Sequence, residues 1–468
     1  LALDTLTEHL RLRGKDAMPN RKELIELCHR RPQHIEHMVR FVLEGGVAAA
    51  APSSFADLVS ERIGLLPYES QLLIQVAAIF GYEVPLSTLE VAAAEHFDSE
   101  QFHDALAVLT VRELLAEEGG MVVFPHYLVR EVVYDSTPAD VRRVLHDLAY
   151  TSLNDDFTPD LILGHHADMA DQAHLAAVLL ERAGDAAVHQ LDDKGACELY
   201  HRALDASRKQ LMSDPSEANE ARYVTVSVKL ADALRITGDL ILARGVLAEA
   251  RRYAQEAPAL TAAIDRAEGS LLALEGWLEP AEECLRRGLG IAIQTGQTKL
   301  MTELYLDLAS LLVRAGRTEA AIDELREGID LITFGEGPRG RGGPASLWML
   351  VFRVGKLEAG RGNLREAASM GEASLRRAEA TASIVGQARV RGFLSGVYQE
   401  LGDIAREKMH RERAIHDLRM LGDRRGTAEM LLAAARPTME IGRKRPELVG
   451  EAERLASELG ETIDELGS

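Results

Sequence analysis

The residues of this chain that could do chemistry are few, and the richest group of them is a cluster of histidines and aspartates. His165 and His166 are followed closely by Asp168, Asp171 and His174. On a helix, His165 and Asp168 would share one face, whereas His166 would point about 100° away from them. This spacing does not favour a metal site, and we interpret the cluster as the start of a helix with its polar side chains in solvent.

Two glycine-containing strings match nucleotide-binding loops only in part. The segment 335–340 has the glycine spacing of a dinucleotide-binding turn, but Pro338 lies inside it and no strand pattern precedes it. A flexible loop between helices fits this segment better. Gly14-Lys15 lacks both the upstream glycine and the hydroxyl residue of a phosphate-binding loop. Protease, nucleophile-elbow and kinase signatures are also missing. We therefore expect no catalytic residue, no metal and no cofactor in this chain, which is then not an enzyme.

Charge and cysteine content restrict the possible partners and compartment. The 468 residues carry a formal net charge of −21, which argues against a broad grip on nucleic acid or on an anionic membrane. Cys28, Cys197 and Cys284 follow no metal or redox spacing, so we expect a reduced, cytoplasmic protein. No apolar run approaches the roughly 18–20 residues of a membrane span. The chain begins with Leu1 in a helical pattern, and we expect it to be a piece of a longer protein.

The elements that must position any functional residue come from an internal repeat. A helical pattern, a glycine and a second helical pattern recur, and the second helix carries a small residue with a large apolar one four positions later, as in Ala243 and Leu247. The glycines are Gly238, Gly276, Gly316, Gly362, Gly402 and Gly442, at intervals of 38, 40, 46, 40 and 40 residues. A period of roughly 40 residues built from paired helices predicts an α-solenoid, because one pair alone cannot bury its apolar surface.

The repeat resembles the tetratricopeptide repeat, above all at Leu394-Ser395-Gly396-Val397-Tyr398 followed by Gly402-Asp403. The resemblance covers about residues 165–460 and is nearest to the longer-helix variant of large bacterial signalling regulators. It implies that the first helix of each pair lines a concave binding face. Six residues would then face inward: Arg266, Ser310, Phe352, Lys356, Arg389 and Gln399. Their basic members could receive an acidic peptide or a phosphate; the alternative is a solvated polar face. We interpret Trp277 and Trp348 as packing residues.

Residues 51–137 have a different pattern, typical of a winged helix. Amphipathic helices are predicted over 54–65 and 68–80, a further one opens at Pro85, and another is capped by Ser99. Two short apolar runs, 114–116 and 121–124, follow and are joined by Glu117-Glu118-Gly119-Gly120, which indicates a hairpin. Between residues 54 and 136, fourteen acidic residues face three basic ones. This excess of acidic residues excludes sequence-specific DNA binding. We therefore expect the module to pack against other protein domains.

The segment Phe124–Tyr134 resembles the Phe-x-His-x-Leu-x-Arg-Glu-x-x-Tyr stretch of bacterial signal-transduction ATPases of the STAND class. Segment 31–42 resembles the end of their nucleotide-binding lid, although Arg30-Arg31 replaces the usual Gly-Asn pair. The resemblance implies three parts: a lid remnant (1–50), a winged helix (51–137) and a tetratricopeptide-like array (138–468). It further implies that ATP and Mg²⁺ bind in a missing domain of the parent protein. Such parents carry DNA-binding outputs, as in bacterial transcription regulators, or kinase or cyclase outputs.

The sequence thus predicts a mainly α fold, with a winged helix followed by a tetratricopeptide-like superhelix. We expect the sensor and protein-interaction region of a signalling ATPase, which binds a protein, a peptide or a small effector on the concave face and regulates its own NTPase domain. A homo-oligomer is possible on this view, and direct nucleic-acid or membrane binding is not expected. The alternative is a constitutive helical-repeat scaffold for protein assembly.

Overall fold

The computed structural model describes residues 32–44, 54–153, 157–190, 192–335, 346–435 and 446–459. Over these ranges the chain forms 22 helices and three short strands, which confirms the predicted mainly α fold. The chain divides into two compact units, residues 1–219 and 220–468. Most of the predicted lid remnant, the predicted loop at 336–344 and the predicted turn at Gly442 lie outside the described residues.

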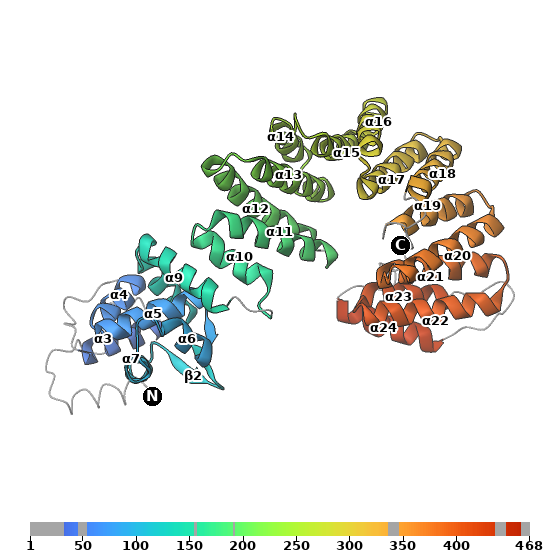
Figure 1. The fold of residues 1–468 in the computed structure, drawn as a ribbon. Coiled ribbons are helices and arrows are strands. Elements are labelled where there is room, and N and C mark those ends of the chain that lie inside the picture. The colour runs from blue at the N-terminus through green and yellow to red at the C-terminus, as the bar shows by residue number, and fades with distance from the viewer. Residues whose placement is uncertain are drawn as a thin grey trace. The chain divides into compact units, whose positions relative to one another are not determined.

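The first unit combines helices with one small sheet (Figure 1). Its described helices are α3 (Pro32–Leu43), α4 (Phe55–Gly64), α5 (Tyr68–Phe80), α6 (Leu86–Ala93), α7 (Ser99–Val111), α8 (Tyr127–Ser136), α9 (Ala139–Leu153), α10 (Asp160–Met169), α11 (Ala173–His189) and α12 (Asp193–Ser213). Its strands are β1 (Glu83–Pro85), β2 (Ala116–Glu118) and β3 (Met121–Val123), antiparallel in the order β1-β3-β2. The predicted hairpin is therefore present, and Gly119 and Gly120 at its turn both have positive φ.

Two details of this module differ from the sequence expectation. Strand β1 was not predicted, because three residues are too few to show an alternating pattern. Helix α7 is capped by Asp98 rather than by Ser99. The Asp98 carboxylate accepts from the backbone N–H of Gln101 at 2.8 Å, while the Gln101 side chain accepts from the Asp98 N–H at 3.0 Å. This reciprocal capping box starts the helix one residue earlier than a serine cap would.

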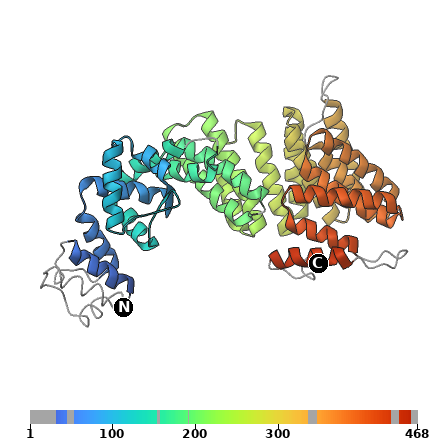
Figure 2. The ribbon, with the colours of Figure 1, turned by 90° about the horizontal axis from the view of Figure 1, so that it is seen from below.

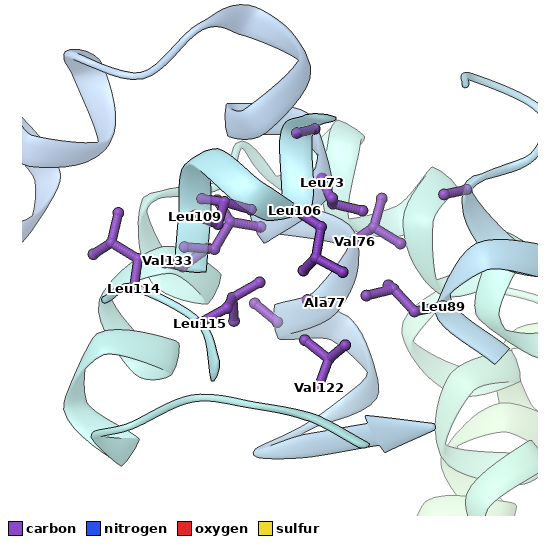
Figure 3. Packing of buried hydrophobic residues seen from close by; sticks show 14 of the residues in the cluster. Leu73, Val76, Ala77, Leu89, Leu106, Leu109, Leu114, Leu115, Val122 and Val133 are labelled. Carbon is purple, nitrogen blue, oxygen red and sulfur yellow. The ribbon is translucent and has the colours of Figure 1, made fainter. Parts of the chain in front are cut away.

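The core of the first unit lies between α5, α7, the sheet and the helices that follow. Figure 3 shows Leu73 and Val76 of α5 close to Leu106 of α7, with Val122 of β3 below them. The same cluster includes Leu145 and Ala149 of α9. The core thus continues past residue 137, where the sequence analysis places a domain boundary; that boundary and the winged-helix assignment stay predictions.

A buried arginine joins α3 to the module. Arg62 of α4 has no exposed surface, and its guanidinium donates to three acceptors. It forms a two-pronged ion pair with Glu44, donates to Nδ1 of His37 at 2.7 Å, and donates to the Arg112 carbonyl at 2.8 Å. Because a buried guanidinium is stable only when its donors are satisfied, this network holds α3 against α4 and the end of α7.

The second unit is a series of antiparallel helix pairs, which lie side by side as the yellow and orange helices of Figure 2. We call the odd-numbered helices first helices and the even-numbered ones second helices. The described helices are α13 (Glu217–Thr237), α14 (Leu240–Ala250), α15 (Pro258–Glu275), α16 (Leu278–Thr295), α17 (Thr298–Arg314), α18 (Thr318–Gly335), α19 (Leu347–Gly360), α20 (Leu364–Ala380), α21 (Ile384–Glu400), α22 (Ile404–Met420), α23 (Arg424–Ala435) and α24 (Pro446–Leu459).

The repeat glycines stand where the sequence predicts them. Positive φ angles are found at five of them: Gly238, Gly276, Gly316, Gly362 and Gly402. This left-handed conformation favours glycine and ends the first helix of each pair. Gly296 and Gly422 have the same conformation between successive pairs, a second set of turns that the sequence analysis missed. Ala243 and Leu247 are fully buried, as the small-then-large pattern predicts.

Other glycines let helices approach so closely that no side chain fits. A methyl group on Gly269 of α15 would lie 2.7 Å from Cγ of Leu285 of α16. A methyl group on Gly328 of α18 would lie 2.6 Å from the Tyr305 ring of α17. Contacts between carbon atoms begin near 3.5 Å, so these positions set how near the paired helices lie.

The two tryptophans do not behave alike. Trp348 is buried, and its carbonyl accepts from the hydroxyl of Ser374 at 2.8 Å, as expected of a packing residue. Trp277 is 61% exposed, so its assignment as a packing residue is wrong. It follows the turn at Gly276 and caps α16, and this position at the end of a helix pair leaves its ring uncovered.

Candidate ligand-binding groove

Consecutive first helices of the second unit contact one another directly: α15 with α17, α17 with α19, and α19 with α21. Within the described residues, the second helices α20 and α22 do not contact each other to the same extent as these first helices do. First helices therefore lie closer together than second helices and form the inner face of the array. This arrangement agrees with the expectation that first helices line the concave side.

A groove of about 700 Å³ opens on this inner face, over α13, α15 and the start of α17. Its apolar lining comes from Val224, Val228, Ala259, Leu260, Ala263 and Leu300. Its polar lining comes from Thr225, Lys229, Asp232, Arg266, Gln297, Thr298, Lys299 and Glu303, with Gly296 at the turn. The volume lies within the range of small-molecule sites, roughly 300–1,000 Å³.

Helix α15 creates the hollow because it presents small side chains. Ala259 and Ala263 stand one turn apart on the face that its neighbours would otherwise fill. The next inward residue is Arg266, one turn further along. The groove thus has an alanine floor with a charged group at one end.

Arg266 is the centre of an ion-pair network that joins three first helices. Its guanidinium pairs with Asp232 of α13, with Glu303 of α17 at 3.5 Å, and with Asp307 of α17 at 3.3 Å. Asp307 also accepts from the Ser270 hydroxyl at 2.8 Å. Since Arg266 reaches carboxylates on both sides, α15 lies between α13 and α17, and the network fixes their spacing.

In this network three carboxylates pair with the single guanidinium of Arg266. Burial alone would lower the pKa of Arg266, but Asp232, Asp307 and Glu303 raise it above the usual value, so the guanidinium stays protonated. Burial also raises the pKa of Asp307 above its usual range, although Arg266 acts against this. Three carboxylates therefore surround the Arg266 guanidinium, and Arg235 lies 3.8 Å from Asp232.

The remaining predicted residues lie on α17, α19 and α21, beyond the groove. The Ser310 hydroxyl donates to the Leu306 carbonyl at 2.8 Å and accepts from Arg353 at 3.4 Å. The Phe352 ring packs edge-on against Phe393, with centroids 5.4 Å apart. Lys356 Nζ lies 5.9 Å from the centroid of the Phe352 ring. This part of the inner face carries an aromatic pair beside a cation.

Arg389 is exposed and Gln399 is half-buried, and neither side chain forms a hydrogen bond or an ion pair with another described residue. Of the six predicted residues, only Arg266 lines the groove. The ligand-binding role of all six stays a prediction.

The sequence analysis missed most of the groove's polar residues. Lys229 precedes Asp232 by three positions on α13, and Lys299 precedes Glu303 by four positions on α17. A comparison of the first helices with one another could have found these residues. In both helices the lysine and the acidic residue are spaced so that they lie on the same helix face.

A second polar cluster lies in the first unit, where the sequence analysis expects solvent. That expectation is wrong: His166 of α10 is only 3% exposed, because α10 packs between α9 and α11. Its Nδ1 lies 3.0 Å from Nδ1 of His146, and Nε2 of His146 lies 3.0 Å from the Tyr134 hydroxyl. With neutral rings, the tautomers of His146 and His166 set which group donates in each of these two hydrogen bonds.

Burial lowers the pKa values of all three histidines in this cluster. The pKa of His146 falls to about 3, through burial first and then through the neighbouring His166 and His165. The pKa of His166 falls to about 4, again through burial and then His165. The pKa of His165 is lowered by burial and by Arg202. Within the described ranges, no group of three His, Cys, Asp or Glu side chains is placed to hold a metal ion. No helix in those ranges is long and apolar enough to span a membrane.

The arrangement is that of a helical-repeat protein of the tetratricopeptide type. No protein-family model matches the chain, and no curated protein matches it either. Among solved structures, the chain is similar to a signal transduction ATPase with numerous domains (STAND) from Pyrococcus horikoshii that carries a tetratricopeptide repeat sensor. The sequences are 18% identical, the TM-score is 0.51, and the match covers 96% of this chain. The chain spans 64% of the length of that protein. The helical-repeat fold expected from the STAND resemblance is thereby confirmed.

Two regulators of the Rap type are also similar to the chain. A Rap conjugation gene regulator of plasmid pLS20, solved with the Phr* peptide, is 16% identical with a TM-score of 0.40, over 86% of this chain and 99% of that one. A Rap protein complexed with competence and sporulation factor is 13% identical with a TM-score of 0.41, over 68% of this chain and 82% of that one.

Proposed function

We propose that this chain is the ligand-sensing, protein-interaction part of a multidomain signal-transduction ATPase. The observation that carries the proposal is the groove over α13, α15 and α17, on the face where successive repeats touch. The shared fold with a STAND protein that has a repeat sensor supports it. ATP and Mg²⁺ would bind in a nucleotide-binding domain outside this chain, which would itself supply no catalytic group.

The Arg266 network offers a route from the groove to the packing of the array. A ligand that contacts Asp232 or Glu303 competes for the same carboxylates that pair with Arg266. Any displacement of them changes the spacing of α13, α15 and α17. Regulation requires that the ligand prefer one spacing over the other, because only a difference in affinity shifts an equilibrium.

ATP turnover and oligomeric state of the full-length parent test this proposal. Replacement of Ala263 by Leu fills the groove floor, and we expect it to change how turnover responds to the native inducer. Ala405→Leu, on the exposed face of α22, is the matched control. Deletion of residues 220–468, which leaves the first unit and its core complete, should change basal turnover or assembly. Unchanged turnover and assembly in both variants would contradict a regulatory role.

The second candidate is a constitutive scaffold. The close contacts at Gly269 and Gly328 favour it, because helices that touch without side chains have little room to shift. A partner complex whose affinity does not depend on the nucleotide state of the parent would support this alternative.

A further inference from the structure

Trp277 and the exposed apolar residues around it lie at the end of α15 that is opposite to the groove. We propose that they form a self-association surface, through which α13–α16 of one chain bind α13–α16 of a second copy. In this twofold contact the Trp277 ring of each chain packs on α14 of the other.

The surface is formed around the turns within two successive helix pairs, α13–α14 and α15–α16. Its five large apolar side chains are all exposed, and they are Ile236, Ile241, Leu242, Leu274 and Trp277. Arg244 of α14 forms an ion pair with Glu275 of α15, so the two turns lie side by side. Contiguous exposed apolar side chains of this kind mark interaction sites. We call this set of five residues the turn patch.

The same positions are polar at the other described turns of the second unit. The residue after the turn glycine is there Asp239, Arg317, Asn363 or Asp403. The carboxylates of Asp239 and Asp403 cap the following helix, because they accept from backbone N–H groups at 3.2 and 3.0 Å. Trp277 holds the same position but caps nothing with its side chain. Loss of a cap typically costs about 1 kcal/mol, so this pair gives up stability and exposes an indole, which indicates a binding role.

Ile241 is the second departure from the repeat pattern. It stands three residues after its turn glycine, where three other pairs carry the charged residues Glu279, Glu319 and Arg365. Its side chain is 90% exposed. The two most exposed members of the turn patch therefore both replace polar residues, one on each helix pair.

The layout of the turn patch is self-complementary, and this favours a second copy as its partner. The Arg244–Glu275 ion pair lies between Ile241 on one side and Trp277 on the other. A twofold axis through the ion pair places Trp277 of each chain against Ile241 of the other. The same rotation brings each Arg244 near Glu275 of the second copy, so that the four charges alternate in sign.

Helix α14 has room for the indole of the second copy. Gly245 and Ala248 are exposed and follow Ile241 by four and seven residues, which places all three on one face. A methyl group added to Gly245 would meet nothing within 4 Å. Two indoles and the aliphatic side chains beneath them would bury on the order of 1,000 Å² in total, near the lower limit of specific interfaces. We therefore expect a reversible dimer.

Sedimentation equilibrium of the intact chain, between about 1 and 100 μM, tests for this dimer. The native chain should show a reversible equilibrium between one and two chains. Trp277→Ala and Ile241→Ser should each weaken the dimer at least tenfold, with unchanged circular dichroism spectra. Met420→Ala is the matched control, because Met420 is an exposed apolar residue beside the turn at Gly422 and should have no effect. An unchanged dimer in Trp277→Ala, or an equal loss in Met420→Ala, overturns the inference.

Exchange of charges tests the twofold arrangement itself. Arg244→Glu alone brings four carboxylates together at the axis, and Glu275→Arg alone brings four guanidinium groups together, so each variant should be monomeric. An equimolar mixture of the two should form a mixed dimer, since each chain supplies the charge that the other lacks. Sedimentation of a fluorescently labelled Arg244→Glu chain, with and without unlabelled Glu275→Arg chain, measures this.

A mixture that stays monomeric while the native chain dimerises shows that the ion pair does not lie on the twofold axis, and it overturns the inference. A native chain that is monomeric at every concentration overturns it as well, and leaves the turn patch to another domain of the parent protein. None of these variants changes a residue that lines the groove, so the proposed function stands or falls by its own experiment.

Discussion

Arg266 is the residue on which the inner face of the array most depends. Its replacement by Leu would leave Asp232, Glu303 and Asp307 close together without the cation that they share. Removal of one partner from a buried ion pair typically destabilises a protein by about 3–5 kcal/mol. Because the three carboxylates are partly exposed, we expect a loss of about 2–3 kcal/mol in the free energy of unfolding.

Urea unfolding of the intact chain measures this effect. Arg389→Leu is the control, since Arg389 is exposed and pairs with no other described residue, and it should stay within about 0.5 kcal/mol of the native chain. Equal stability of the two variants would show that the network contributes nothing. The helical spacing was enough to predict that Arg266 faces inward. Its partners were not predictable, because ion pairs between repeats depend on which residues face one another across helices far apart in the sequence.

At the scale of elements, the distance between α15 and α16 depends on Gly269. Gly269→Ala places a methyl group 2.7 Å from Cγ of Leu285 and must push the helices apart or force a rotamer change. Overpacking of this kind costs about 1–3 kcal/mol. Gly290→Ala, on α16, meets nothing within 4 Å and should stabilise the chain by up to about 1 kcal/mol through helix propensity. Thermal unfolding followed by circular dichroism distinguishes them; a shift of the same sign would contradict the packing argument.

The histidine cluster between α8, α9 and α10 makes the first unit sensitive to acid. The folded-state pKa values of His146 and His166 are lowered to about 3 and about 4, below the ordinary value of 6.5. The unfolded chain therefore binds more protons below pH 6.5, and stability falls as pH falls from there toward 4. Each histidine contributes at most about 1.4 kcal/mol per pH unit over this window. The charged neighbours Arg130, Arg142 and Arg202 oppose protonation further.

Urea unfolding at pH 7.5 and pH 5.0, followed by a probe in the first unit, checks the effect. His146→Gln keeps a polar side chain and should reduce the pH dependence. An unchanged dependence in this variant would assign the acid sensitivity to other groups. The sequence pattern located His165 and His166 on a helix but placed them in solvent, because one helix alone does not show which neighbours cover it.

At the scale of the whole molecule, the net charge of −21 agrees with the way in which the arginines of segment 54–136 are used in the structure. The three arginines of segment 54–136 all donate inward. Arg62 pairs with Glu44, Arg112 donates to the Leu65 carbonyl at 3.2 Å, and Arg130 donates to the Ala78 carbonyl at 2.8 Å. Their charges are directed at the chain itself, while the fourteen acidic residues of this segment keep its balance strongly negative.

We therefore expect no mobility shift of a duplex DNA probe at about 10 μM chain and 100 mM salt, conditions under which non-specific binders respond. A shift that weakens with salt would contradict this. The order of a small α/β module before a helical array was predictable from periodicity and from the glycine spacing. The division between residues 219 and 220 was not predictable, because it falls inside helix α13 rather than in a loop between helices.

The buried Arg62 has a practical consequence for anyone who cuts this protein into expressible pieces. A fragment that starts at Ser54 would begin just before α4 and would contain the whole predicted winged helix from its first described residue. It would lack both His37 and Glu44, so the guanidinium would keep only the Arg112 carbonyl as a partner. Uncompensated buried charge of this kind promotes unfolding and aggregation. A piece that keeps the whole network together with an intact α3 begins at or before Pro32.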